Sequence, residues 1–493
     1  MTTMRPWMLR AAFARRLSAL YGAEVPAYTT LVEVAHEVNR DVVADLGASA
    51  ERLGGIERVT AERHGAVRVG TPHELAQLAR IFGAMGMRPV GYYDLRDAAP
   101  TPVPVVSTAF RPVDPDELAR NPFRVFVSLL ATADRRFFTP ELAARLEAFL
   151  ERRRLFPPRL LELAERAERR EGLDTDDAAE FLDLATASFR LSREPIDRRW
   201  YGELEAVSPV AADIGGLTST HINHLTPRVL DIDALYERMR ERGIEMIDTI
   251  QGPPRWDGPQ VLLRQTSFRA LSEERRFAEA DGRTSTGSLR VRFGEVEARG
   301  IALSARGRDL YDRLLAEADL RSAADPARDR AEVMRAVWER EFPATETELA
   351  AEGLGAFTFT AVTDRPRDGR PPENDLRALL DAGWLTARPI VYEDFLPRSA
   401  AGIFRSNLTS AGSRDAAEPG ADLDSGWLAG VLGRPLADPS ELYERRHSAT
   451  LTAALDRLGI RRPPEAPAGP VHQADPTTQP TPSTTTAGVD RDH

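Results

Sequence analysis

The sequence predicts an α+β protein in which a βαββ module occurs twice among long helical segments. Two observations predict this class. The order strand, helix, strand, strand occurs in residues 61–113 and again in residues 206–305. Before, between and after these modules, apolar residues recur three and four positions apart, which is the period of a helix.

The elements follow from the local patterns in order. Leu17, Leu20 and Tyr21 recur at helical spacing and predict a helical arm. The runs HGAVRV, RPVGYYDL and VPVVSTAFRPV then predict strands, with a helix from Pro72 to Gly86 after the first of them. Highly charged helical sequences such as RLLELAERAERREGL follow, with a polar face wide enough to be solvated.

The strand pattern returns at HINHLTPRVL, followed by a helix from Asp231 to Arg242, a short strand at IEMIDTI, and strands at VLLRQTSFRAL and SLRVRFGEVEARG. The Pro- and Thr-rich C-terminus cannot bury enough apolar surface to fold, and we expect it to be disordered. The predicted parts are a helical arm (1–60), the first module (61–113), a helical insertion (114–205), the second module (206–305), a helical and mixed region (306–460) and the tail (461–493).

The composition excludes several kinds of active site. The chain has 493 residues, no cysteine and no lysine, so all 65 basic side chains are arginine. Without a thiolate there is no cysteine-ligated zinc or iron–sulfur site and no cysteine nucleophile. Without lysine there is no Schiff-base amine and no P-loop lysine. Any metal must bind to His, Asp or Glu, and any anionic substrate to arginine, whose planar fork holds both oxygens of a carboxylate.

Charge and hydropathy argue against nucleic-acid and membrane partners. The net charge is −11, and the arginines are mostly interleaved with acidic residues. No run reaches the roughly 18 apolar residues that a membrane span needs. Arginines interrupt the apolar start of the chain, which fits an amphipathic helix better than a signal or transit peptide. We therefore expect a cytoplasmic protein.

Short matches between the two modules indicate an internal duplication. His64 and Arg68 lie four apart in HGAVRV, as do His224 and Arg228 in HLTPRV, 160 positions later. The run TAFR of the first module corresponds to TSFR of the second at an offset of 158. Two matches in the same order at nearly one offset are hard to obtain by chance.

The duplication turns two histidines into candidate metal ligands. Residues four apart on a strand face the same side, so each module presents one His beside one Arg. His221 and His224 lie three apart and face opposite sides, and the match with His64 selects His224. A lone buried histidine is usually a hydrogen-bonded core residue, but two in equivalent positions of a duplicated sheet favour one shared metal.

A carboxylate would complete a site of two histidines and one carboxylate, which leaves positions free on ferrous iron. Glu295, Glu297 and Arg299 share one face of the last predicted strand of the second module. Three charges cannot point into a dry core, so this face either lines a polar cavity or lies at a solvated edge. The spacing does not separate Glu295 from Glu297.

Five motifs occur in sequence: HGAVRV, STHINHLTPRVLDID, LLRQTSFRAL, RFGEVEARG and VYEDFLPRSAAGIF. In these motifs the chain resembles the 2-oxoadipate dioxygenase/decarboxylase family, a branch of the vicinal oxygen chelate superfamily. The resemblance runs from about Tyr21 to Leu458. It implies duplicated βαββ modules that form a cupped sheet around a metal.

The resemblance also implies an activity and a ligand set. The family converts 2-oxoadipate and O₂ to 2-hydroxyglutarate and CO₂, a step of lysine catabolism, with Fe(II) as cofactor. Its iron ligands correspond to His64, His224 and Glu295, which selects Glu295 over Glu297. Arg68 corresponds to the arginine that holds a substrate carboxylate, and we expect it to orient the carbon that is hydroxylated.

The last motif departs from the family pattern. Arg398 stands where the family has valine, and it would either contact the substrate carboxylate or swing out and widen the pocket, so the exact 2-oxo acid stays open. The adjacent Ser399 is a candidate hydrogen-bond partner of the substrate. Arg228 either repeats the role of Arg68 or pairs with a nearby carboxylate, and His221 is a candidate support for the metal strand.

Two other functions fit the same fold. A non-oxidative isomerase or epimerase would use the metal to stabilise an enediolate, with Glu297 as base, and would turn over without O₂. A metal-free binding protein would bind its ligand without forming product. Beyond a small 2-oxo acid and O₂ the sequence indicates no partner, and it leaves the oligomeric state and the product stereochemistry open.

Overall fold

The computed structural model describes residues 3–98, 102–290, 292–363, 375–396, 413–415 and 417–460. The strands are β1 (Arg63–Val69), β2 (Arg88–Asp94), β3 (Val105–Arg111), β4 (Arg124–Leu130), β5 (Ile196–Asp197), β6 (Ile222–Pro227), β7 (Leu263–Ser267), β8 (Glu273–Ala278), β9 (Thr284–Leu289), β10 (Glu295–Arg299), β11 (Phe357–Ala361) and β12 (Leu385–Pro389). The helices are α1 (Pro6–Glu24), α2 (Pro26–Leu46), the 3₁₀ helix η1 (Gly47–Leu53), α3 (Ile56–Ala61), α4 (Pro72–Ala84), α5 (Pro115–Arg120), α6 (Pro140–Arg152), α7 (Pro158–Arg170), α8 (Thr175–Ala187), α9 (Arg198–Val207), α10 (Pro209–Gly215), α11 (Ile232–Glu241), α12 (Ala305–Ala324), α13 (Arg330–Glu341), α14 (Glu346–Ala351), α15 (Leu376–Asp381), α17 (Ser425–Leu432) and α18 (Pro439–Leu458). Among the described helices, none is long and apolar enough to cross a membrane. The predicted tail lies outside the described residues.

The first module forms in the predicted order β1, α4, β2, β3. Helix α4 begins at Pro72 because the Thr71 hydroxyl accepts a hydrogen bond from the Glu74 amide, while the Glu74 carboxylate accepts one from the Thr71 amide. The strands belong to a five-stranded sheet in the order β2-β3-β4-β1-β6. Strand β6 opens the second module and runs antiparallel to β1, so the two modules meet at this pair.

One strand of this sheet, β4, lies in the segment 114–205, which was predicted to be a helical insertion. All seven of its residues, RVFVSLL, are buried, because β4 lies between β3 and β1. A strand that is covered on both faces has a nearly continuous apolar run and lacks the alternation that identifies a half-exposed strand. The helical period of α6, α7 and α8 therefore dominates the pattern of the segment.

The second module repeats the first, with β6, α11, β7 and β10 in place of β1, α4, β3 and β4. Strand β10 pairs antiparallel with β7, and a parallel bridge joins Arg228, just after β6, to Glu297 of β10. The short strand expected after α11 is reduced to two bridges with the β7 region, Met246 to Phe268 and Gln251 to Gln265. The segments of the second module thus occur in the same order as those of the first.

Strand registers confirm the duplication. In the first module Thr108 is the partner of Val127, and in the second Thr266 is the partner of Val296. Because Thr108 matches Thr266 in the sequence, Val127 matches Val296, at an offset of 169. The parallel pairs give the same offset, since Arg68 is the partner of Ser128 and Arg228 is the partner of Glu297.

This register shows how the two modules differ in chemistry. Phe126 of β4 occupies the place of Glu295 in β10, and Ser128 occupies the place of Glu297. The matched strands therefore keep the histidine in both modules but the carboxylates only in the second. A carboxylate in each module would add a fourth protein ligand to a shared site.

The predicted strand SLRVRFGEVEARG is divided in the structure. Its first residues end β9, which forms a ribbon with β8 in a separate sheet with β5, and its last residues form β10. Between them Arg292 is buried and donates hydrogen bonds to Glu273 and Glu24. Gly294 lies against the Phe268 ring, where a Cβ atom would come within 2.2 Å of the ring. These contacts turn the chain and break the strand.

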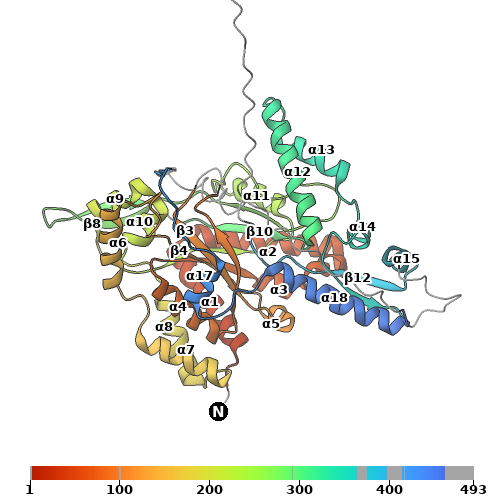
Figure 1. The fold of residues 1–493 in the computed structure, drawn as a ribbon, viewed down its shortest axis with the longest axis horizontal. Coiled ribbons are helices and arrows are strands. Elements are labelled where there is room, and N and C mark those ends of the chain that lie inside the picture. The colour runs from red at the N-terminus through yellow and green to blue at the C-terminus, as the bar shows by residue number, and fades with distance from the viewer. Residues whose placement is uncertain are drawn as a thin grey trace, which may run out of the picture.

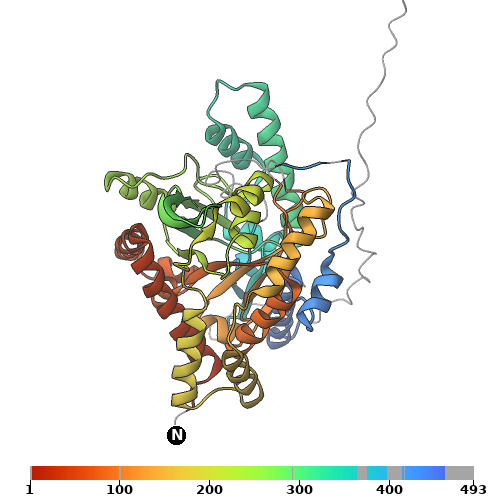
Figure 2. The same cartoon turned by 90° about the vertical axis from the view of Figure 1, so that its left-hand side faces the viewer.

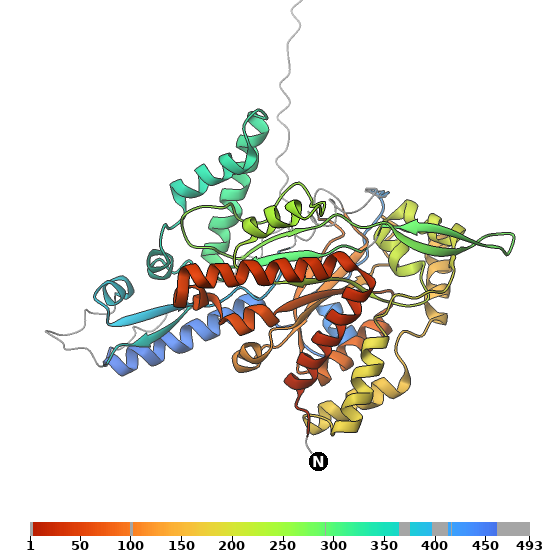
Figure 3. The ribbon, with the colours of Figure 1, turned by 180° about the vertical axis from the view of Figure 1, so that it is seen from behind.

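Helices cover the sheet and extend beyond it. Figure 3 shows α2 lying across the back of the molecule, where it packs against β6 and α11. One apolar core joins α1, α2, α4 and the helices from α6 to α11 to the sheet, and a second joins α12, α13, α14, β11 and α18. The pair α12 and α13 projects from the body in Figures 1 and 2, and the β8–β9 ribbon projects elsewhere in Figure 1.

Candidate metal centre

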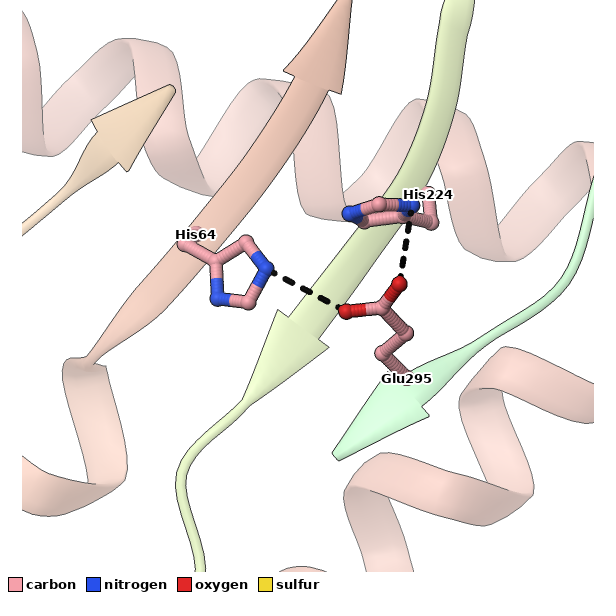
Figure 4. A group of neighbouring side chains, drawn as sticks. All are labelled: His64, His224 and Glu295. Atoms are coloured by element: carbon pink, nitrogen blue, oxygen red, sulfur yellow. Dashed lines mark ion pairs between the residues drawn. The ribbon is translucent and has the colours of Figure 1, made fainter. Parts of the chain in front are cut away.

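Three strands bring His64, His224 and Glu295 together (Figure 4). His64 lies on β1, His224 on β6 and Glu295 on β10. Nε2 of His64 lies 3.5 Å from Oε2 of Glu295, and Nδ1 of His224 lies 3.5 Å from Oε1. One ligand atom from each residue lies within 4.8 Å of the others. The residues are only 2%, 5% and 5% exposed, so the cluster is enclosed by protein.

The β1–β6 pairing explains why the two histidines face one another. His224 is the partner of Ala66, two residues after His64, so the two side chains are diagonal neighbours on one face of the sheet. Their ring centroids lie 5.5 Å apart, and the ring planes are nearly perpendicular at 85°. Strand β10 then supplies the carboxylate from the far side of β6.

The two histidines of this cluster differ in protonation. Burial lowers the pKa of His64, but Glu297 and Glu295 outweigh it, so the pKa lies above its ordinary value. Burial lowers the pKa of His224 to about 4, so this imidazole is neutral near pH 7. Its buried Nδ1 makes no hydrogen bond to any described residue. A divalent metal fits this donor set, because it needs neutral imidazole nitrogen and an ionised carboxylate.

Spacing alone did not distinguish Glu297 from Glu295. In the structure Glu297 lies on the opposite side of the His64 ring from Glu295. Its Oε2 atom is 2.8 Å from Nδ1 of His64. It also accepts two hydrogen bonds from Arg299, at 2.7 and 2.9 Å. The predicted charged face of β10 is therefore fully buried and lines a polar interior; it is not a solvated edge.

Arg68 forms an ion pair that the sequence did not indicate. Its guanidinium donates to Asp213 of α10, and both residues are buried. The same carboxylate oxygen accepts a hydrogen bond from Asn223 at 2.8 Å, and the other oxygen lies 3.4 Å from Nε2 of His221. Burial lowers the pKa of His221 to about 4, so this histidine is a neutral neighbour of Asp213.

Arg228 does not extend the metal cluster but joins a buried cluster of charges. It donates to Glu62 at 2.9 Å, and the other oxygen of Glu62 accepts from Arg124 at 2.8 Å. Arg124 also pairs with Glu297, at 3.3 Å, and with Glu393. Sequence reasoning missed Glu62 and Arg124. Glu62 directly precedes β1, and Arg124 is the first residue of the unrecognised strand β4, so neither belonged to a motif.

The segment 391–396 of the last motif is anchored beside the metal cluster. Arg299 donates to the backbone carbonyls of Tyr392 and Asp394, at 2.9 and 3.0 Å. Arg111 holds the Asp394 carboxylate with two hydrogen bonds, of 2.7 and 2.9 Å. Phe395 follows and packs on His64. The next predicted pocket residues, Arg398 and Ser399, lie outside the described residues.

Fold and site together define a protein whose duplicated sheet encloses a candidate metal centre with two histidines and one carboxylate. Three protein ligands leave positions free on a metal, which is the arrangement that metal enzymes use to bind substrate. The chain belongs to the 2-oxoadipate dioxygenase/decarboxylase family, whose model matches residues 13–407. This membership confirms the resemblance that the five motifs indicated.

Comparisons with individual proteins agree with the family. A 2-oxoadipate dioxygenase/decarboxylase of Mycobacterium tuberculosis is 56% identical over 436 residues, which are 88% of this chain and 95% of that protein. A relative of the same description from Pseudomonas putida is 41% identical over 466 residues, 92% and 98% of the two chains. The solved structure of the hydroxyglutarate synthase from Pseudomonas putida in complex with 2-oxoadipate is similar with a TM-score of 0.78 at 39% identity, and the match covers 93% of this chain and 99% of that one.

Proposed function

We propose that this chain is an Fe(II)-dependent enzyme that converts 2-oxoadipate and O₂ to 2-hydroxyglutarate and CO₂ in lysine degradation. The observation that carries the proposal is the convergence of His64, His224 and Glu295 in a chain of this family. The names of the relatives given above describe enzymes that act on 2-oxoadipate, and the similar solved structure is a complex with 2-oxoadipate. The reaction balances without a second cosubstrate, because both atoms of O₂ enter the two products.

The proposed ligands of the iron are His64, His224 and Glu295. When bound, Fe(II) would supply free coordination positions for the substrate and O₂ and the electrons that O₂ activation needs. Each of these three side chains is buried on a paired strand, which restricts its position. Such preorganisation avoids the cost of assembling the site during the reaction.

In this proposal Arg68 binds a carboxylate of the substrate and orients the carbon that is hydroxylated. Arg68 lies four residues after His64 on β1, so both side chains leave the same face of the strand. The ion pair with Asp213 fixes the direction of the guanidinium. A planar fork that is held in this way can bind both oxygens of a carboxylate in one orientation.

Apolar rings exclude water from one side of the cluster. Phe395 packs on His64, and Phe126 packs on Phe395 with ring centroids 5.1 Å apart. A dry wall protects reactive species from water and strengthens the electrostatic contacts inside the pocket. Arg398 and Ser399 follow Phe395 in the sequence. We propose that they contact the substrate and select substrates by chain length.

Oxygen uptake tests the proposal directly. Protein loaded with Fe(II) is given a series of 2-oxo diacids and 2-oxo monoacids, and O₂, CO₂ and the hydroxy acid are measured. We expect one O₂ consumed and one CO₂ released per 2-oxoadipate, with a 2-hydroxy diacid one carbon shorter. Product formation without O₂ would contradict the proposal and support a non-oxidative isomerase or epimerase.

A further inference from the structure

Glu297 is placed to hold one of the proposed metal ligands from behind. It lies two residues after Glu295 on β10, so the two carboxylates leave the same face of the strand. Glu295 faces Nε2 of His64, and Glu297 faces Nδ1 at 2.8 Å. The imidazole of His64 therefore lies between the two carboxylates of one strand. At 2.8 Å the carboxylate and the imidazole are close enough to form an ion pair.

The Glu297 carboxylate is itself held rigidly. Arg299 donates one hydrogen bond to each of its oxygens, and Arg124 lies 3.3 Å from Oε1. Arg299 is fixed in turn by the backbone carbonyls of Tyr392 and Asp394. The contacts come from β4, β10 and the segment after β12, so the position of the carboxylate does not depend on a single element.

The two ring nitrogens of His64 face different carboxylates. Nδ1 faces Glu297, which is engaged by Arg299 and Arg124, and Nε2 faces Glu295 of the candidate metal cluster. This geometry assigns Nδ1 to the supporting contact and leaves Nε2 as the metal-binding atom.

We propose that Glu297 is a positioning residue whose carboxylate pairs with Nδ1 of His64 and so holds Nε2 in the direction of the metal. The inference rests on the proposed metal site. Histidine ligands of metals commonly donate their second ring nitrogen to a carboxylate, and loss of that partner typically costs about 10–100-fold in metal affinity or activity. The contact also joins the modules, since His64 belongs to the first and Glu297 to the second.

The comparison of the two modules agrees with this role. The place of Glu297 in the first module is taken by Ser128, whose hydroxyl is engaged with Ser107 at 2.9 Å. Strand β10 of the second module therefore carries both the proposed ligand Glu295 and the supporting carboxylate of Glu297.

The test separates contact from charge with three variants. Glu297→Asp keeps the charge but withdraws the carboxylate from Nδ1 by one methylene. Glu297→Gln keeps the length but removes the charge. Glu62→Gln removes one charge from the same buried cluster, in which Glu62 pairs with Arg124 and Arg228. The affinity of each protein for Co(II), a redox-stable probe, is measured by competition with a chromogenic chelator, and for Fe(II) without O₂.

We expect both Glu297 variants to bind Co(II) at least about 10-fold more weakly than the wild type and Glu62→Gln to lose less than about threefold. Unchanged affinity in the Glu297 variants would overturn the inference, as would an equal loss in Glu62→Gln, which would assign the effect to charge alone. Thermal unfolding of the metal-free proteins identifies a variant that does not fold, and Glu297→Asp then carries the test. A wild-type protein that binds neither metal would overturn the proposed function itself, a result distinct from equal binding by wild type and variants.

Discussion

The ring of Phe395 stands edge-on to the imidazole of His64, with ring centroids 5.0 Å apart and ring planes at 89°. Phe395 comes from the segment after β12 and His64 from β1, 331 positions earlier in the chain. The guanidinium of Arg299 lies over the ring of Phe395, at 5.7 Å from its centroid. Through Phe395, the C-terminal region therefore contributes to the wall of the candidate metal centre.

Truncation of this ring should destabilise the protein. Phe395→Ala removes a buried side chain that packs against Phe126 and His64, and such changes cost about 3–5 kcal/mol. Chemical denaturation of the metal-free protein measures the free energy of unfolding. Phe395→Leu, which keeps most of the volume, should lose less than half as much. A Phe395→Ala protein as stable as the wild type would contradict the packing described here.

Removal of a proposed ligand should abolish metal binding. His64→Ala and Glu295→Ala each leave two of the three ligands, and we expect less than about 5% of the wild-type iron content and O₂ uptake with 2-oxoadipate to fall at least about 100-fold. Metal analysis and an oxygen electrode measure the two effects. His73→Ala, a change at an exposed histidine on α4, is the matched control and should retain both. Full activity in His64→Ala would refute the site assignment.

Chelation should lower thermal stability in the wild type alone. A metal that binds only the folded state stabilises it by about 2.7 kcal/mol when its free concentration is 100 times its Kd. The unfolding temperature of the wild type should therefore fall when iron is removed, while that of His64→Ala should not change. Equal unfolding temperatures of loaded and metal-free wild type would argue against a metal bound to the native fold.

Loss of the proposed substrate clamp should separate substrate binding from metal binding. Arg68→Lys keeps a positive charge beside Asp213 but loses the planar fork, so we expect kcat/KM for 2-oxoadipate to fall by about 100-fold while the iron content stays at the wild-type level. Steady-state oxygen uptake and metal analysis give the two values. Arg68→Ala would also leave Asp213 buried without its ion pair, at a cost of about 3–5 kcal/mol in stability. A variant with unchanged kcat/KM would remove Arg68 from the mechanism.

Acid should weaken the fold through Glu62. Burial raises the pKa of this carboxyl group, but Arg228, Arg124 and Arg58 outweigh it and hold the pKa well below the ordinary value of 4.5. A group with a depressed pKa adds stability above its unfolded pKa, and that stability is lost as the pH falls below about 4.5. Glu62→Gln should be less stable than the wild type at pH 7 and lose less between pH 5 and pH 3. Urea unfolding across this range measures both slopes, and identical slopes would contradict the prediction.

The sequence by itself limited the side chains available for metal and anion binding and indicated the proposed metal ligands. Absence of Cys and Lys left His, Asp, Glu and Arg for metal and anion binding. Matching runs in the two modules selected His64 and His224, and the motif RFGEVEARG selected Glu295 by family resemblance. These features lie close together in the sequence or are repeated in it, so they can be recognised without the structure. The strands β1, β2, β3 and β6 were predictable for the same reason.

The tertiary structure decided which charges meet. Arg124 and Glu297 lie 173 positions apart, and their ion pair exists because β4 and β10 take equivalent places on the two sides of the β1–β6 pair. Periodicity reports which side of an element is buried but not which distant element covers it. The packing of distant elements determines three contacts: the ion pair of Arg68, the carboxylate behind His64 and the ring of Phe395 beside His64. For this reason the sequence indicated the proposed metal ligands, whereas the residues that contact them from behind emerged only from the folded sheet.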